Sequence, residues 1–212
     1  KTFDKWWDES YDDMEDNERL KAISNLITEL NKKSVIMGQI DSPLLKTSLE
    51  SPKKLFKYLK DIKFDYIISS DLGRAFITAF LFAKELNLTH KLSFSKDLRE
   101  INYGIYANKK KEEVKKNCPE YKADKKYIFS EGESFLKVQK RAIKFIQNLD
   151  EKSYKKNKNI LLISHAGVIR TIQAYFNEDE LNDVLDVKIS HSYIGKIVIN
   201  NSKLIDYKIL NN

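Results

Sequence analysis

Three residues whose side chains suit phosphate chemistry each follow a predicted strand: Arg74, Glu100 and His165. An arginine can bind a phosphate group through two parallel hydrogen bonds and always carries its charge. A histidine can donate to a phosphoryl oxygen and stabilise charge that develops in a transition state. A glutamate beside a shielded phosphate can hold a proton and deliver it to a leaving oxygen. Together these residue types predict a site for a phosphate ester.

The strongest positioning signal is a run of four apolar residues at 160–163 that leads directly into Ser164-His165-Ala166-Gly167. Such a run predicts a strand buried on both faces of a parallel sheet. The small residues allow a sharp turn into a helix whose N-terminus suits an anion. His165 would then lie at the carboxyl end of a strand, where open α/β sheets bind ligands. A histidine that only caps a strand is the alternative, and the presence of Arg74 and Glu100 favours the functional interpretation.

The remaining pattern predicts an α/β fold of three layers, in which a mostly parallel sheet lies between helices. Strands are predicted at residues 64–68, 91–94, 160–163, 188–200 and 204–210, and helices at residues 52–60, 75–86, 109–116, 134–148 and from 168 onward. The last two strands should form an antiparallel hairpin. Residues 97–104 should form a loop, and its first part, 97–103, should be the lip of the pocket.

Residues 1–18 differ in composition from the rest of the chain. They hold two lysines and eight acidic residues, a net charge of −6, whereas the whole chain carries +7 and the remainder therefore +13. Phe3, Trp6, Trp7 and Tyr11 fall at helical spacing, which predicts a short amphipathic helix that docks on the body. A peptide that binds a protein partner is the alternative. We divide the chain into this acidic extension and one domain at residues 19–212.

Composition bounds the class of protein. No apolar run approaches the roughly 20 residues that a membrane-spanning helix needs, so we expect no membrane partner. The lone Cys118 cannot form an internal disulfide, which favours a reducing compartment and a cytoplasmic location. No cluster has metal-ligand spacing, so we expect neither a metal nor another cofactor. The basic body could attract nucleic acid, but this hypothesis rests on charge alone and ranks last.

Five segments, in order, resemble the successive signatures of the histidine phosphatase superfamily, in its phosphoglycerate-mutase-like branch. They are Gly38-Gln39-Ile40-Asp41-Ser42-Pro43-Leu44, Ser69-Ser70-Asp71-Leu72-Gly73-Arg74-Ala75, Leu98-Arg99-Glu100-Ile101-Asn102-Tyr103-Gly104, Gly132-Glu133-Ser134 and Ser164-His165-Ala166-Gly167. The resemblance covers roughly residues 20–210 and implies a small phosphorylated metabolite or a phosphoprotein as ligand. It also implies roles: Arg74 and His165 hold the phosphate with help from Asn31 and Gly167, Glu100 lies over the leaving group, and Tyr103 lines the rim.

The family's nucleophile is a histidine in an Arg-His-Gly triplet, and these 212 residues contain no such triplet. Counting back from Asp41 places Ser24-Asn25-Leu26 at that position. A carboxamide nitrogen is no substitute for imidazole as a nucleophile, because its lone pair is delocalised. Alternatively, residues 20–30 form a helix, the first strand moves to residues 35–37, and the triplet has no counterpart. We therefore expect a catalytically impaired phosphate-binding domain. The alternative is an active phosphomonoesterase or mutase-like phosphotransferase with another nucleophile, such as an activated water.

Overall fold

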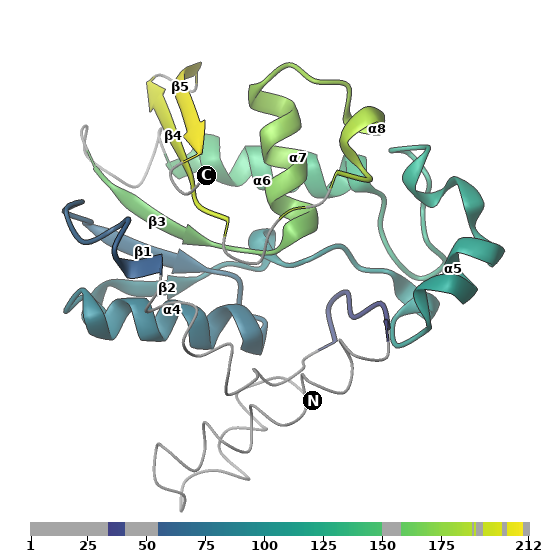
Figure 1. The fold of residues 1–212 in the computed structure, drawn as a ribbon, viewed down its shortest axis with the longest axis horizontal. Helices are drawn as coiled ribbons and strands as arrows, with labels where there is room; N and C mark the ends of the chain where they lie inside the picture. Colours follow the sequence, from purple (N-terminus) through teal and green to yellow (C-terminus); the bar gives the residue numbers. More distant parts are fainter. Residues whose placement is uncertain are drawn as a thin grey trace, which may run out of the picture.

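The centre of the molecule is a three-stranded parallel sheet with the strand order β2–β1–β3 (Figure 1). The computed structural model describes residues 34–40, 55–149, 158–187, 189, 193–200 and 203–209. In this part, β1 is Tyr66–Ser69, β2 is Leu92–Phe94 and β3 is Ile160–Ile163. Since β1 pairs in parallel with both neighbours, all three strands end at the same edge of the sheet.

Helices cover both faces of this sheet. Helix α4 (Gly73–Glu85) lies on one face, and α6 (Phe135–Asn148) and α7 (Ala166–Phe176) lie on the other (Figure 1). The side chains of β3 alternate between the two layers: Leu161 and Ile163 pack with the cluster under α4, and Leu162 packs with the larger cluster under α6 and α7. This alternation is why the apolar run of β3 has no polar side. The predicted three-layer α/β fold is confirmed.

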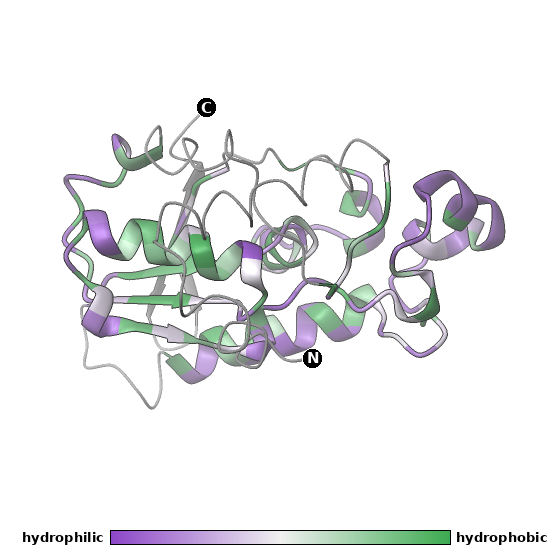
Figure 2. Cartoon of the chain, turned by 90° about the horizontal axis from the view of Figure 1, so that it is seen from below, coloured by the Kyte–Doolittle hydropathy of each residue, from purple (hydrophilic) through white to green (hydrophobic). Residues whose placement is uncertain are grey.

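Helix α6 shows how the sequence determines an element. Ser134 caps it by accepting a hydrogen bond from the main-chain N–H of Lys137 at 3.2 Å. Val138, Ala142 and Ile146 recur at helical spacing and are buried. Figure 2 shows the resulting alternation of hydrophilic and hydrophobic residues along the helices. The predicted range 134–148 differs from the observed one only by the capping residue.

The other elements surround the sheet. They are the helices α5 (Lys111–Asn117) and α8 (Leu181–Val184), and the 3-10 turns Thr89–Lys91, Lys96–Leu98, Gly104–Tyr106 and Pro119–Lys122. Strands β4 (Gly195–Asn200) and β5 (Lys203–Ile209) form the predicted antiparallel hairpin, but β4 begins at residue 195 and not at residue 188 as predicted. Residues 55 and 56 are helical and residues 57–60 form turns, so the helix predicted at 52–60 ends earlier than expected. The part of that prediction before residue 55 lies outside the described residues. No helix in the described ranges is long and apolar enough to cross a membrane.

The segment at residues 34–40 is not a strand of the sheet. Val35 makes a single antiparallel bridge with Lys110. The main-chain N–H of Ile36 donates to the carbonyl of Lys109, and its carbonyl accepts from Asn108, both at 2.8 Å. The hypothesis that the first strand moves to residues 35–37 is therefore wrong, because this segment hydrogen-bonds to the chain just before α5. Ser24, Asn25, Asn31 and the extension 1–18 lie outside the described residues.

Candidate phosphate-binding site

Arg74 and His165, which are 91 residues apart in sequence, form a hydrogen bond. Arg74 lies in the first turn of α4, just after β1, and His165 is the residue before α7, just after β3. Because these parallel strands are neighbours, their carboxyl ends bring both side chains together. The Arg74 Nε–H donates to His165 Nδ1 at 3.2 Å.

This hydrogen bond determines the protonation of the imidazole. Since Nδ1 accepts from Arg74, the ring proton of a neutral His165 resides on Nε2. Nε2 lies 2.9 Å from the Ser70 hydroxyl oxygen and donates to it. Burial, reinforced by the positive charges of Arg74 and Arg141, holds the pKa of His165 well below its usual value. His165 is thus neutral and buried, with 7% of its surface exposed.

The other nitrogens of Arg74 bind the main chain of residues 38–40. One donates to the carbonyl of Gly38 at 2.7 Å, and another to the carbonyl of Ile40 at 3.0 Å. Gly38 has a φ of +55°, and a β-carbon there would lie 3.0 Å from the ring of Tyr103. This position therefore favours glycine for both its backbone angle and its close contact. Arg74 links the 38–40 segment to the site.

Glu100 reaches the same site from the loop after β2. The Ser164 hydroxyl donates to the carbonyl of Leu98 at 2.7 Å, which ties this loop to the end of β3. The carboxylate of Glu100 accepts from the main-chain N–H of Gly167 at 3.2 Å and from that of Ile101 at 3.0 Å. A β-carbon on Gly167 would overlap Glu100 Oε1. Glu100 therefore lies against the N-terminus of α7, two residues beyond His165.

Tyr103, which the sequence predicted to line the rim of the pocket, packs against Gly38 of the 38–40 segment. Its ring lies 4.8 Å from that of the fully buried Phe129, edge to face. Burial raises the pKa of Tyr103, and the nearby charge of Glu100 raises it further. The hydroxyl therefore stays protonated at neutral pH and can donate a hydrogen bond.

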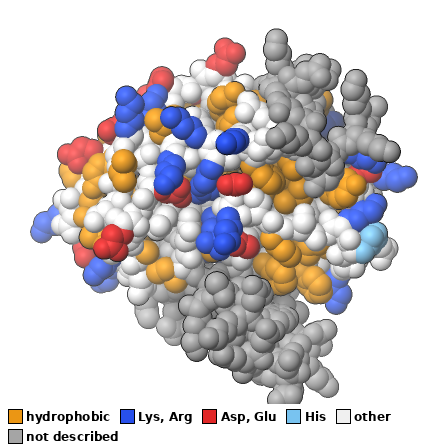
Figure 3. Space-filling model, turned by 180° about the vertical axis from the view of Figure 1, so that it is seen from behind, with side chains coloured by type: hydrophobic (Ala, Val, Ile, Leu, Met, Phe, Trp, Pro, Cys, Tyr) orange, Lys and Arg blue, Asp and Glu red, His pale blue; other side chains and the backbone are white. Residues whose placement is uncertain are grey.

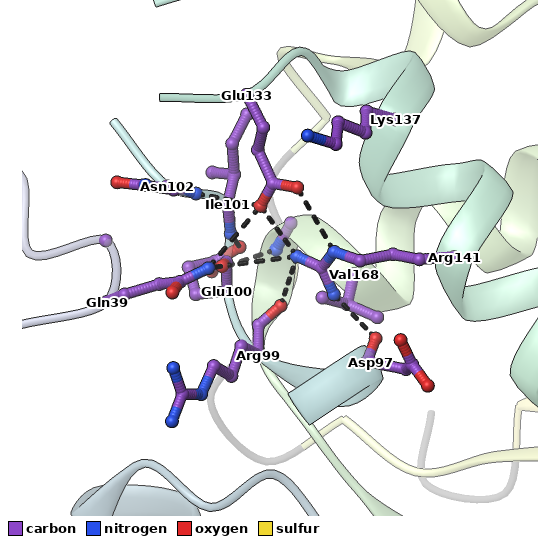
Figure 4. A network of polar contacts seen from close by, with 12 residues as sticks. Gln39, Asp97, Arg99, Glu100, Ile101, Asn102, Glu133, Lys137, Arg141 and Val168 are labelled. Carbon is purple, nitrogen blue, oxygen red and sulfur yellow. Dashed lines mark hydrogen bonds and ion pairs between the residues drawn. The ribbon is translucent and has the colours of Figure 1, made fainter. Parts of the chain in front are cut away.

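Arg141 on α6 is the centre of a polar network behind the Glu100 loop (Figure 4). Its guanidinium donates to both carboxylate oxygens of Glu133, at 2.8 and 3.2 Å. It also donates to the carbonyls of Asp97 and Arg99, at 2.5 and 2.6 Å. The carbonyl of Glu100 accepts two hydrogen bonds, one from Arg141 at 3.3 Å and one from the side-chain amide of Gln39 at 2.9 Å. The network fixes the main chain that carries Glu100.

A second ion pair holds this loop from the other side. Arg99 donates to both carboxylate oxygens of Asp71, with Nε 2.6 Å from Oδ1. Asp71 lies between β1 and α4, three residues before Arg74. The loop of Glu100 is thereby attached to the start of the helix that carries Arg74. Within the described ranges, no group of three or more His, Cys, Asp or Glu side chains could hold a metal ion.

The comparisons with known proteins agree with this geometry. Residues 27–207 match the family model described as "Histidine phosphatase superfamily (branch 1)". The chain belongs to the histidine phosphatase superfamily. Its fold is also found in the "Alpha-ribazole Phosphatase from Shigella flexneri", with a TM-score of 0.73 and 24% identity over 87% of this chain and 91% of that one.

Relatives of this histidine phosphatase domain include phosphatases and mutases. It is 31% identical over 176 residues to "Broad-specificity phosphatase YOR283W" of Saccharomyces cerevisiae, and the aligned region covers 76% of this chain and 72% of that protein. It is 27% identical over 193 residues to "2,3-bisphosphoglycerate-dependent phosphoglycerate mutase" of Buchnera aphidicola subsp. Cinara cedri (strain Cc), covering 76% and 84%. The resemblance stated from the motifs is confirmed at the level of the family.

Among the site residues predicted for this histidine phosphatase domain, Arg74, Glu100, His165 and Gly167 lie together. Sequence reasoning missed Arg141. One signal could have revealed it: Arg141 directly precedes Ala142 of the apolar stripe on α6, and it follows the glutamate of Gly132-Glu133-Ser134 by eight residues. A partly buried arginine at such a position needs a carboxylate partner.

Proposed function

We propose that this histidine phosphatase domain binds a phosphorylated ligand and is catalytically impaired. The ligand class is a small phosphorylated metabolite or a phosphoprotein, and the binding groups are Arg74 and His165. The observation that carries the proposal is the hydrogen bond between Arg74 Nε and His165 Nδ1. This hydrogen bond holds a permanent cation beside a buried imidazole at the carboxyl edge of the sheet, where α/β proteins bind their ligands and where an anion is stabilised by the positive charge.

The N-terminus of α7 supports the same conclusion. Gly167 is the second residue of this helix, and its main-chain N–H donates to the carboxylate of Glu100 within the site. A helix N-terminus carries a partial positive charge, which favours a phosphate even though Glu100 already accepts from Gly167 there. Phosphate bound there would place negative charge beside His165 and favour its protonation. Asn31 is proposed to assist, on the family resemblance alone.

The impairment is proposed from the sequence. Asn25 stands where the family's nucleophilic histidine is expected, and Ser24 stands where its arginine is expected. Neither side chain can attack phosphorus or neutralise its charge as the family's pair does. Each tenfold loss in rate corresponds to about 1.4 kcal/mol of barrier. A pseudophosphatase of this kind would retain binding and lose turnover, and we place it in the cytoplasm because of its lone cysteine.

An active enzyme is the second candidate. It would be a phosphomonoesterase or a mutase-like phosphotransferase that uses another nucleophile, such as an activated water. The relatives named above favour it, since they are a phosphatase and a mutase. The position of Glu100 at the N-terminus of α7, where it accepts from Gly167, also suits a proton donor. Nucleic-acid binding by the basic body remains a third and weaker proposal.

Titration with inorganic phosphate tests the binding site. By isothermal calorimetry the full chain should bind one phosphate, and Arg74→Ala should lose this binding. Lys96→Ala is the matched control, because Lys96 is exposed and outside the contacts described above. Binding that survives Arg74→Ala, or a chain that binds no phosphate, would refute the proposed site. Circular dichroism of each variant shows whether the fold is retained.

A further inference from the structure

A groove between α6 and α7 lies away from the candidate phosphate site. It has a volume of about 230 Å³ and is lined by Gln139, Lys140, Ile143, Lys144, Gln147 and Tyr175. Tyr175 is ten residues along α7 from His165, about 15 Å at the rise of an α-helix. The groove is therefore separate from the site of Arg74 and His165.

The side chains of this groove suit an acidic partner with an aromatic ring. Ile143 is buried and provides an apolar floor, and Tyr175 remains 44% exposed. Lys140 and Lys144 are exposed and lie one helical turn apart at the rim. None of the described side chains that line the groove is acidic. Figure 3, viewed from behind, shows several Lys and Arg side chains on this face of the molecule, with Asp and Glu side chains among them.

We propose that residues 1–18 of this chain dock in the α6–α7 groove. This segment carries a net charge of −6, opposite in sign to the rim. Phe3, Trp6, Trp7 and Tyr11 follow the spacing of one helix face, so one aromatic edge could face Tyr175 while the acidic residues face the lysines. The proposal concerns residues outside the described ranges and is independent of phosphate binding.

The length of the connecting chain permits this docking. Sixteen residues lead from Glu18 to Ser34, the first described residue. Fully extended, they span on the order of 50 Å. A domain of this size has a radius of gyration of about 17 Å. The segment can therefore reach any face of its own domain.

A second hollow provides a comparison. Its volume is about 500 Å³, and its lining residues are Phe56, Lys60, Asp61, Ile62, Lys63, Phe64, Glu85, Leu86, Leu88 and Lys91. Two acidic side chains, Asp61 and Glu85, offset its lysines. Because Asp61 and Glu85 repel the acidic segment 1–18, we expect this hollow to attract that segment less than the α6–α7 groove does.

The tryptophans give a selective signal for the test. The chain has two, Trp6 and Trp7, and both belong to the proposed docking segment. In the full chain at low salt, their emission should be blue-shifted and protected from acrylamide. The double variant Lys140→Glu/Lys144→Glu should red-shift the emission and raise the quenching constant several-fold, because repulsion replaces attraction. Moderate salt should weaken the protection of the unaltered chain by screening.

The matched control reverses two lysines at the second hollow. Lys60→Glu/Lys63→Glu should leave the emission and the quenching unchanged. The proposal would be overturned by tryptophans as accessible in the unaltered chain as in a free peptide, by protection that survives Lys140→Glu/Lys144→Glu, or by protection lost only in the control. Protection that increases with protein concentration would also overturn it, since the segment would then bind a second copy. Circular dichroism verifies that the variants are folded.

Discussion

The main-chain N–H of Gly167 donates a hydrogen bond to Glu100 Oε2 over 3.2 Å. A carboxylate of the chain itself thus occupies the N-terminus of α7, two residues from the buried His165. This is the position that favours an anionic ligand most. A phosphate that approaches Arg74 and His165 therefore meets a fixed negative charge beside its binding groups.

The first prediction removes that charge. Glu100→Gln keeps an oxygen that can accept from Gly167 but is neutral. Two like charges a few ångströms apart repel by about 1 kcal/mol even with the full screening of bulk water, so phosphate affinity should rise by at least roughly fivefold. Calorimetry with inorganic phosphate at constant ionic strength measures the change. A loss of affinity would instead mean that Glu100 is protonated in the complex and donates to the ligand.

The second prediction concerns the close contact at Gly167. A β-carbon there would overlap Glu100 Oε1, so Gly167→Ala must displace the carboxylate. The expected loss in the free energy of unfolding is about 1–3 kcal/mol, as for other overpacked sites. The neighbouring Ala166 is exposed, and Ala166→Ser is the control. Urea titration of both variants provides the comparison, and equal stability would contradict the described contact.

These contacts mark where sequence reasoning ends. The apolar runs predicted β1 and β3, and the sharp turns after them placed Arg74 and His165 at one edge of the sheet. That step needs only the rule that neighbouring parallel strands end together. The hydrogen bonds of Arg141 to main-chain carbonyls carry no such signal, because a carbonyl has the same chemistry at every residue. The bridge between Val35 and Lys110 is likewise a tertiary contact. The apolar pattern of residues 35–37 is the same for a strand of the sheet and for a single bridge, so the sequence could not tell them apart.

The third prediction follows from the lowered pKa of His165. As the pH falls through about 6.5, the unfolded chain protonates this histidine while the folded chain does not. The unfolded state then binds more protons, so the free energy of unfolding decreases with decreasing pH, until the folded pKa is reached. His165→Gln should flatten this part of the profile. Urea titrations between pH 7.5 and pH 5 measure both curves, and parallel curves would contradict the neutral, buried state.

The fourth prediction tests the network behind the Glu100 loop. Glu133→Gln leaves the guanidinium of Arg141 without its carboxylate, and the side chains of the two residues are only 8% and 16% exposed. Breaking such a buried pair should cost about 3 kcal/mol of unfolding free energy. Lys137→Ala on the exposed side of α6 is the control and should change stability by about 0.5 kcal/mol or less. A Glu133→Gln protein as stable as the control would show that the network contributes little.

The central claim is that the domain binds phosphate without turning it over, and hydrolysis of an aryl phosphate by the unaltered chain tests it most directly. The assay includes Arg74→Ala and the triple variant Ser24→Arg/Asn25→His/Leu26→Gly. We expect turnover at or near background for the unaltered chain and no significant further loss in Arg74→Ala. We also expect a gain in the triple variant that Asn25→His alone does not give. Robust hydrolysis by the unaltered chain that disappears in Arg74→Ala would contradict the account and establish the active enzyme instead.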